Sequence, residues 1–312
     1  MVAPNTVLRN IKNYNQYLDT FHDTHKSVYF EYLISLSFAH IMHLPFYSVD
    51  SDDSSVKYRV VWYGDIKNSP PTPAPSGPDS IIYAHNNFML IEATRKEGKK
   101  QWSQEFAQAV SHRDSFVGGD ENKKEMTFIV LVTTKLNKYT YDSIKTKEKF
   151  IPLQIDSIEK ILKTSILAFS TKHLEVIKLL GEISEILRDS DSIKNYLSRV
   201  NKCLDNWQEK ILNKEKRLFI GIKSYEALVK SSGSIMSASE ILLKLKKNPV
   251  VRQYFNLIEE DISLKIMERG LIEESLGCLT RTLKENFYYP VPKEDFKGRA
   301  RRIIKAVEDA NA

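Results

Sequence analysis

Residues 77–96 read GPDSIIYAHNNFMLIEATRK, and this stretch decides the fold. Two runs within it, Ser80–Ala84 and Phe88–Thr94, are rich in apolar and β-branched residues and are separated by the polar residues 85–87. This pattern predicts two antiparallel strands joined as a hairpin. Five prolines in residues 68–79 exclude helix and central strand, so we expect an extended, stiff loop to lead into the hairpin.

The sequence on both sides of the hairpin predicts further strands and helices. Apolar, β-branched runs predict strands at 57–63, 126–133 and 150–155. Apolar residues at helical spacing predict two opening helices before Pro45 and later helices at 99–113, 139–149 and 156–167. The expected fold is α/β, with a mixed sheet flanked by helices. The helix at 99–113 would make a parallel crossover between its neighbouring strands.

The remainder of the chain predicts a mostly α-helical C-terminal region. Ser237 and Glu240 have the spacing of a capping box at the start of a helix. The segment Leu218–Val229 combines strand-like and helix-like residues. We therefore expect two domains, 1–168 around the sheet and 169–312 built from helices, which fits a chain of 312 residues.

Composition and charge narrow the class of protein. No apolar run approaches the ~20 residues of a membrane helix, and no secretory signal pattern opens the chain, so we expect a cytoplasmic protein without a membrane partner. Two cysteines exclude a disulfide framework. The net charge is +6, and residues 201–250 hold ten bases against five acids. That stretch is either a face for a polyphosphate partner or a solvated lysine-rich surface.

Two carboxylates in the deciding stretch point to chemistry. Asp79 stands at the start of one strand and Glu92 lies inside the apolar run of the next. If the strands pair, the two side chains can converge at one end of the sheet. Close carboxylates repel each other unless a hard cation lies between them, and oxygen ligands favour Mg²⁺, for which Mn²⁺ can substitute. Such an ion can assist hydrolysis of a phosphodiester.

At these residues the sequence resembles the PD-(D/E)xK nuclease superfamily, in particular type II restriction endonucleases. Pro78-Asp79 matches the PD element, and Glu92-Ala93-Thr94 occupies the (D/E)xK position. Glu31 resembles the glutamate of the first helix, and Gln101, Gln104 and Gln108 resemble a glutamine motif that follows the catalytic strand. The resemblance covers about residues 20–168 and implies a restriction-endonuclease-like fold.

The resemblance also implies an activity, a metal site and partners. The activity is Mg²⁺-dependent cleavage of double-stranded DNA, by a homodimer, with a cognate methyltransferase acting on the same site. It implies metal ligation by Asp79, Glu92 and the Ala93 carbonyl, with catalytic roles for these two acids and for Thr94, Glu31 and Lys96. Candidate DNA contacts are Arg95, Lys99, Lys100, Gln104 and Gln108, and, from the basic stretch and its flank, Lys244, Lys246, Lys247 and Arg252.

One position departs from the family pattern, because the motif lysine is Thr94. A threonine offers only a hydroxyl to the attacking water. Lys96 shares the face of Thr94 if the strand continues, so Lys96 is a candidate substitute. A non-catalytic DNA-binding or assembly subunit on a degenerate nuclease fold therefore remains the alternative, and an RNA- or repair-directed nuclease is a third.

Structural roles compete with each of these assignments. Asp79 is a common residue after proline in turns, and Glu31, Gln104 and Gln108 are ordinary helix residues. His112 stands at the end of the expected helix 99–113, where we interpret it as a cap rather than a phosphate contact. Glu92 is the hardest to explain structurally, because it lies inside an apolar strand.

Overall fold

The computed structural model describes residues 2–66, 77–84, 87–147, 149–168, 173–230, 236–258, 260–267, 278–281 and 286–288. It divides the chain into two compact units, one of Met1–Ile166 with Lys172–Trp207, the other of Leu167–Thr171 with Gln208–Ala312. The boundary between Trp207 and Gln208 falls within one long helix. The functional division into a catalytic domain 1–168 and a recognition region 169–312 stays a prediction.

The first unit is built on a six-stranded mixed sheet in the order β1-β2-β3-β4-β5-β6. Its strands are β1 (Phe46–Ser48), β2 (Arg59–Trp62), β3 (Ser80–Ala84), β4 (Asn87–Thr94), β5 (Thr127–Thr133) and β6 (Phe150–Gln154). β3 is antiparallel to β2 and to β4, whereas β1–β2, β4–β5 and β5–β6 are parallel pairs. The hairpin of β3 and β4 and the parallel crossover to β5 are confirmed.

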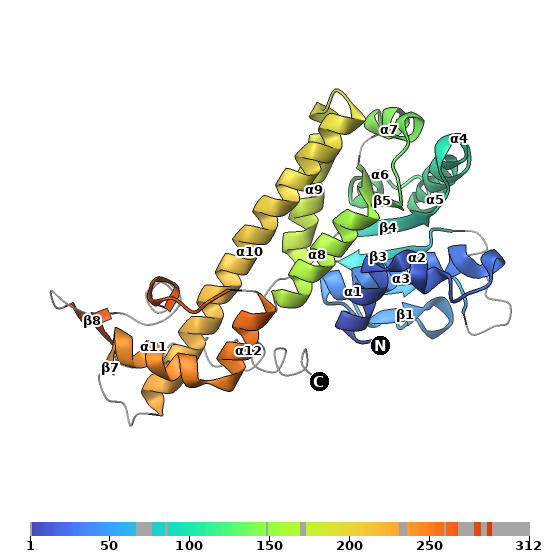
Figure 1. Cartoon of the computed structure of the whole chain (residues 1–312). Coiled ribbons are helices and arrows are strands. Elements are labelled where there is room, and N and C mark those ends of the chain that lie inside the picture. The colour runs from blue at the N-terminus through green and yellow to red at the C-terminus, as the bar shows by residue number, and fades with distance from the viewer. Residues whose placement is uncertain are drawn as a thin grey trace. The chain divides into compact units, whose positions relative to one another are not determined.

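Helices flank this sheet (Figure 1). In chain order they are α1 (Pro4–Lys12), α2 (Tyr14–Leu18), η1 (Asp23–His25), α3 (Lys26–Met42), η2 (Val49–Ser51), α4 (Gly98–Lys100), the π-helical η3 (Gln101–Phe106), α5 (Ala107–Val117), α6 (Glu121–Glu125), α7 (Lys138–Lys145), α8 (Ile155–Leu167) and α9 (His173–Asp189). The expected α/β fold with flanking helices is therefore confirmed.

The core of this unit explains why the strands form. The central part of β5, Ile129–Val132, is fully buried, as expected for a strand between two parallel neighbours. Leu90 and Ile91 of β4 are buried on opposite faces of the sheet. α3 buries Phe30, Leu33 and Ile34, so an apolar surface of this helix packs in the core of the unit.

Two tyrosine hydrogen bonds and one ion pair connect residues beyond 168 to the first unit. Tyr196 donates to the Pro152 carbonyl over 2.6 Å, and Tyr141 donates to the Ser190 carbonyl over 3.0 Å. Lys160 of α8 forms an ion pair with Asp205. These contacts explain why residues beyond 168 belong to the first compact unit.

The second unit is mostly helical, as expected. α10 (Ile193–Val229) enters it at Gln208, and it continues with β7 (Met236–Ser237), α11 (Ala238–Lys247), α12 (Pro249–Leu257), β8 (Cys278–Arg281) and β9 (Asn286–Tyr288). The capping box is confirmed, because Ser237 Oγ accepts from the Glu240 amide and Glu240 Oε2 accepts from the Ser237 amide. The strand-like interpretation of part of 218–229 is wrong. Phe219, Ile220 and Ile222 are buried in the core of this unit as helix residues.

Several sequence-based expectations need smaller corrections or fall outside the described residues. β1 follows directly after Pro45 and was not expected. The helix expected at 139–149 ends at Lys145. Most of the proline-rich loop and of the turn at 85–87 lies outside the described residues. Among the described residues, no helix is both long and apolar enough to span a membrane.

Candidate active site

The pairing of β3 with β4 brings Asp79 and Glu92 together. Ser80 lies opposite Ile91 in the register, so residues 79 and 92 are the next opposite pair, and opposite residues on antiparallel strands share a face. Asp79 Oδ2 accepts a hydrogen bond of 2.6 Å from the Ala93 amide. The Tyr63 amide donates to the Asp79 carbonyl over 3.0 Å, which ties Asp79 to the end of β2. Both carboxylates therefore lie at one end of the hairpin.

Burial and mutual repulsion oppose ionisation of these two acids. Asp79 is partly buried, and Glu92 has 6% of its surface exposed. Burial raises the pKa of Asp79 well above its usual value, and the charge of Glu92 raises it further, while the Ala93 amide opposes the shift. Burial also raises the pKa of Glu92, with a further contribution from Glu105. Without a cation, the pair favours its protonated forms.

Glu31, on α3, joins the same cluster. Burial, together with the charges of Asp79, Glu105 and Glu92, raises the pKa of Glu31 to about 10. The charge of Lys96 opposes this shift. Its Oε2 is buried and accepts no hydrogen bond within the described part of the chain. A buried, unpartnered carboxyl oxygen is unfavourable, so this atom indicates a place where a further group is accommodated.

Lys96 and Glu105 border the cluster. β4 ends at Thr94, so Lys96 does not extend the strand face, and its Nζ forms an ion pair of 2.6 Å with Glu105 Oε1. Glu105 is carried by η3, and its charge acts on all three buried acids. Such single π-helical turns inside helices are frequent at functional sites. Sequence reasoning missed Glu105, since nothing in its spacing distinguishes it from an exposed helix residue.

His112, on α5, contacts Glu92 directly. His112 Nδ1 and Glu92 Oε1 are 2.7 Å apart, and burial lowers the pKa of His112. The interpretation of His112 as a helix cap is wrong, because α5 continues to Val117 and ends at Gly118, which has φ +60°. His112 therefore orients the Glu92 carboxyl group, a role that its distance in sequence from Glu92 concealed.

Thr94 and Gln101 shape the end of the catalytic strand. Thr94 is buried, and its Oγ1 accepts from the Lys96 amide over 3.0 Å. Gln101 is fully buried, and its Nε2 donates to the carbonyls of Lys96 and Lys135 at 3.0 Å each, while its Oε1 accepts from the Asn137 amide. Gln101 thus joins the segments that follow β4 and β5.

The donors at this site fit a hard divalent cation. Asp79, Glu92 and the Ala93 carbonyl offer oxygen ligands alone, which suits Mg²⁺ or Mn²⁺. A cation would also relieve the repulsion that raises the pKa of the buried acids. No three His, Cys, Asp or Glu side chains of the described segments already form a metal-binding group. The fit therefore rests on two carboxylates and a carbonyl.

The expected DNA contacts divide between the two units. Around the acid cluster, Arg95 is partly exposed, and Lys99, Lys100, Gln104 and Gln108 are exposed. In the second unit, Lys244, Lys246 and Lys247 are exposed on α11, and Arg252 is exposed on α12. Exposure leaves all of them accessible, and their contact with DNA stays a prediction.

Comparisons with known proteins give a family. A family model described as AlwI restriction endonuclease matches residues 4–167. Among solved structures, the chain is similar to the small subunit R.BspD6I2 of the heterodimeric restriction endonuclease R.BspD6I, with 17% sequence identity and a TM-score of 0.44. That match covers 66% of this chain and 99% of the subunit, and its similarity is too low to support an inference about function. No curated protein matches the sequence.

The family match covers the parts of the molecule that build the acid cluster. It extends over more than half of the chain and includes β1 to β6. It also includes Glu31, Asp79, Glu92, Glu105 and His112. The chain belongs to the AlwI restriction endonuclease family.

Proposed function

We propose that this chain is a Mg²⁺-dependent endonuclease that hydrolyses phosphodiester bonds in double-stranded DNA, as a sequence-specific type II restriction enzyme. One observation carries the proposal. Asp79 and Glu92 share a face at one end of a hairpin, where burial raises the pKa of both carboxyl groups well above their usual values. Membership in a restriction endonuclease family supports the same activity.

The residues of the cluster receive distinct roles in this proposal. Asp79, Glu92 and the Ala93 carbonyl hold Mg²⁺, or Mn²⁺ in its place. The ion supplies charge stabilisation to the phosphate and lowers the pKa of a water molecule. The hydrogen bond from the Ala93 amide fixes Asp79, and His112 fixes Glu92. Both ligands are thereby oriented before DNA binds.

Three further residues act near the attacking water. In the metal-free chain Glu31 is protonated near neutral pH, because its pKa is about 10, and a cation at Asp79 and Glu92 would lower that pKa. The Thr94 hydroxyl is the group at the motif's lysine position, where it positions the water. Lys96 supplies a positive charge near the cluster, although Glu105 holds its amino group.

The proposal extends to partners and location. Cleavage of both DNA strands calls for two such clusters, and a homodimer supplies them by symmetry. A methyltransferase that modifies the same site would protect the host DNA, and both proteins would act in the cytoplasm. Sedimentation of the full chain with and without duplex DNA tests the dimer. A strictly monomeric complex that still cuts both strands would contradict it.

Plasmid cleavage tests the activity itself. Wild-type protein should cut plasmid DNA with Mg²⁺ or Mn²⁺ and leave it intact with a chelator. Asp79→Asn and Glu92→Gln should abolish cutting, whereas Asp114→Asn, which changes an exposed acid on α5, should not. Single-stranded DNA and RNA serve as competing substrates, and preferential cleavage of either would overturn the choice of duplex DNA.

The threonine at the motif's lysine position, Thr94, favours a second candidate function. A chain without the motif lysine could serve as a non-catalytic DNA-binding or assembly subunit on the same fold. The two candidates differ in one outcome. A folded wild-type chain that binds duplex DNA yet leaves it intact with both Mg²⁺ and Mn²⁺ would support the subunit and contradict the nuclease.

A further inference from the structure

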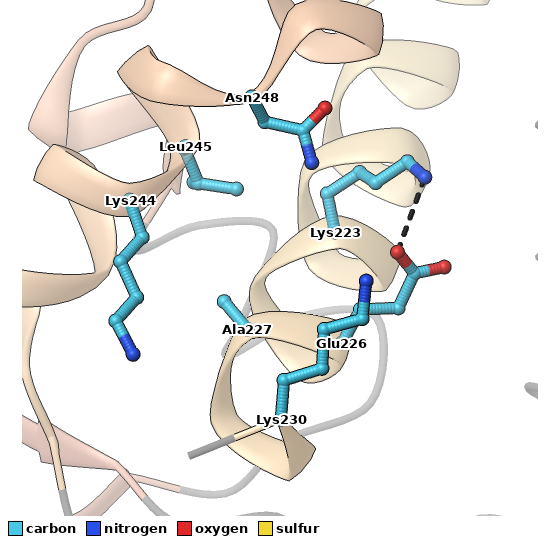
Figure 2. A pocket seen from close by; sticks show the side chains of 7 residues that line it. All are labelled: Lys223, Glu226, Ala227, Lys230, Lys244, Leu245 and Asn248. Atoms are coloured by element: carbon cyan, nitrogen blue, oxygen red, sulfur yellow. Dashed lines mark hydrogen bonds and ion pairs between the residues drawn. The ribbon is translucent and has the colours of Figure 1, made fainter.

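A small cavity in the second unit is lined by lysines. It has a volume of about 160 Å³ and lies between α10 and the α11–α12 turn. Figure 2 shows the residues around it, with Lys223, Glu226 and Ala227 on α10 and Lys230 directly after that helix, facing Lys244, Leu245 and Asn248. Residues 223, 226, 227 and 230 follow i, i+3, i+4 and i+7 spacing, so they lie along one side of α10 and its end.

The charges around the cavity favour an anion. Three ammonium groups and one carboxylate line it, which gives a formal net charge of +2. Lys223 has only 6% of its side chain exposed, and its Nζ contacts Glu226 Oε2 at 3.1 Å. Glu226 thus balances Lys223, and the ammonium group of Lys230 adds positive charge beyond that pair.

Asn248 adds a neutral hydrogen-bond donor. Its Oδ1 accepts from the amides of Val250 and Val251, which caps the N-terminus of α12. With the oxygen engaged, the amide nitrogen is the group free to donate, and Figure 2 shows it on the side that faces α10. An amide donor beside ammonium groups is a common combination in phosphate sites.

The size of the cavity restricts the ligand. Small-molecule sites measure about 300–1,000 Å³, so a cavity of 160 Å³ is too small for a whole nucleotide. It has room for a phosphate group with a few water molecules, each of which occupies about 30 Å³. The methyl group of Ala227 and the side chain of Leu245 supply its apolar wall.

Helix electrostatics alone do not explain this arrangement. Lysines in the last turn of a helix offset the partial negative charge of its C-terminus, which accounts for Lys244 on α11 and Lys230 after α10. It does not account for Lys223, which is buried two turns before the end of α10. The core around Phe219, Ile241 and Tyr254 holds the helices that form the cavity walls.

We propose that this cavity binds a phosphate group of the DNA backbone, through Lys223, Lys230, Lys244 and the amide nitrogen of Asn248. This inference rests on the proposed function, which supplies DNA as the ligand. The contact is independent of base sequence and adds to affinity. It gives Lys223, Lys230 and Asn248 a role that the sequence did not indicate.

The test measures how salt weakens binding of the full chain to a fluorescent duplex of mixed sequence, in metal-free buffer. Lys230→Gln should reduce the slope of log affinity against log salt by about one, and weaken binding roughly tenfold at ~0.1 M salt. Glu226→Gln should have the opposite effect, because it removes the acid that balances Lys223. Lys265→Gln removes an exposed charge in the same unit but away from the cavity, and should bind like the wild type.

The opposite signs of the two cavity variants separate this proposal from a general loss of charge. Circular dichroism confirms that each variant is folded, and Lys230→Arg, which keeps the charge, should retain the wild-type slope. If Lys230→Gln and Glu226→Gln both bind like Lys265→Gln, the cavity does not contact DNA. If inorganic phosphate raises the melting temperature of the wild type but the salt slopes are unchanged, the ligand is a free anion and the DNA assignment is wrong.

This binding assay and plasmid cleavage together distinguish failure of this inference from failure of the proposed function. A wild-type chain that cuts DNA while the cavity variants bind normally would overturn only the cavity. A wild-type chain that shows the predicted slopes but never cuts DNA would overturn the nuclease and leave the phosphate contact in place.

Discussion

The two units of the molecule accommodate buried ionisable side chains in different ways. In the first unit, Asp79, Glu92 and Glu31 form one acid cluster, and burial raises the pKa of all three carboxyl groups above their usual values. In the second, the buried Lys223 has a carboxylate partner, Glu226, at 3.1 Å. A buried charge is unfavourable unless it is paired, so the first arrangement indicates a missing cation and the second a nearly balanced site with surplus positive charge.

This difference predicts that the two units contribute to separate steps. The acid cluster should govern bond cleavage, and the lysine-lined cavity should govern affinity for DNA. Variants that alter cleavage but not DNA affinity, or affinity but not cleavage, would support this separation. Variants that alter both equally would contradict it.

The largest effect is expected from loss of a metal ligand. Asp79→Asn or Glu92→Gln should lower the cleavage rate by at least about 10³-fold, because metal ions contribute several kcal/mol to charge stabilisation. Binding of duplex DNA in metal-free buffer should persist in both variants. Single-turnover cleavage and fluorescence anisotropy measure the two steps. A variant that keeps a rate within tenfold of wild type would contradict the metal role.

A smaller effect is expected from the cavity. Lys230→Gln should need on the order of tenfold more protein for half-maximal single-turnover cleavage, because a phosphate contact is weakened. At saturating protein its cleavage rate should equal that of the wild type. A reduced rate at saturation would show that the two units do not act separately in this way.

His112 should have an intermediate effect on cleavage alone. His112→Ala removes the partner of Glu92 Oε1, and loss of such a supporting contact typically reduces metal affinity or activity by about 10–100-fold. His112→Asn keeps a donor near the same position and should recover part of the loss. The measurement is cleavage across a series of Mn²⁺ concentrations. Equal losses in both variants would show that packing, not the hydrogen bond, is responsible.

The last prediction concerns stability and its dependence on pH, not cleavage or DNA binding. The pKa of Glu31 is raised from 4.5 to about 10, so the unfolded chain ionises this group at a lower pH than the folded chain. The metal-free protein should therefore lose stability as pH rises between these values, by up to about 1.4 kcal/mol per pH unit for one group. Glu31→Gln should flatten this dependence in denaturant unfolding curves. An equally steep profile in the variant would contradict the assignment.

Much of the fold could be predicted from local sequence, because its pattern and its structure agree there. The apolar runs of β3, β4 and β5 and the helix between β4 and β5 specify the sheet and its parallel crossover. β1 is only three residues long and has too little pattern to detect. α10 was misjudged in part because Phe219, Ile220 and Ile222 favour strands in isolation but are buried by helix packing.

The candidate site contains some residues that could be predicted from the sequence and others that could not. Asp79 and Glu92 could be found because pairing of consecutive strands follows from the turn between them. His112 and Glu105 approach the acids only through the path of η3 and α5 over the sheet, and that path depends on tertiary packing. The cavity around Lys223 escaped notice for the same reason, since its walls come from helices separated in sequence.

A calorimetric titration of Mn²⁺ and Mg²⁺ into the full chain tests the central claim most directly. The wild type and Asp114→Asn should show saturable uptake of the ion, and Asp79→Asn and Glu92→Gln should lose it. Absence of uptake in a folded wild type, or uptake unchanged in both variants, would contradict a metal site at these carboxylates.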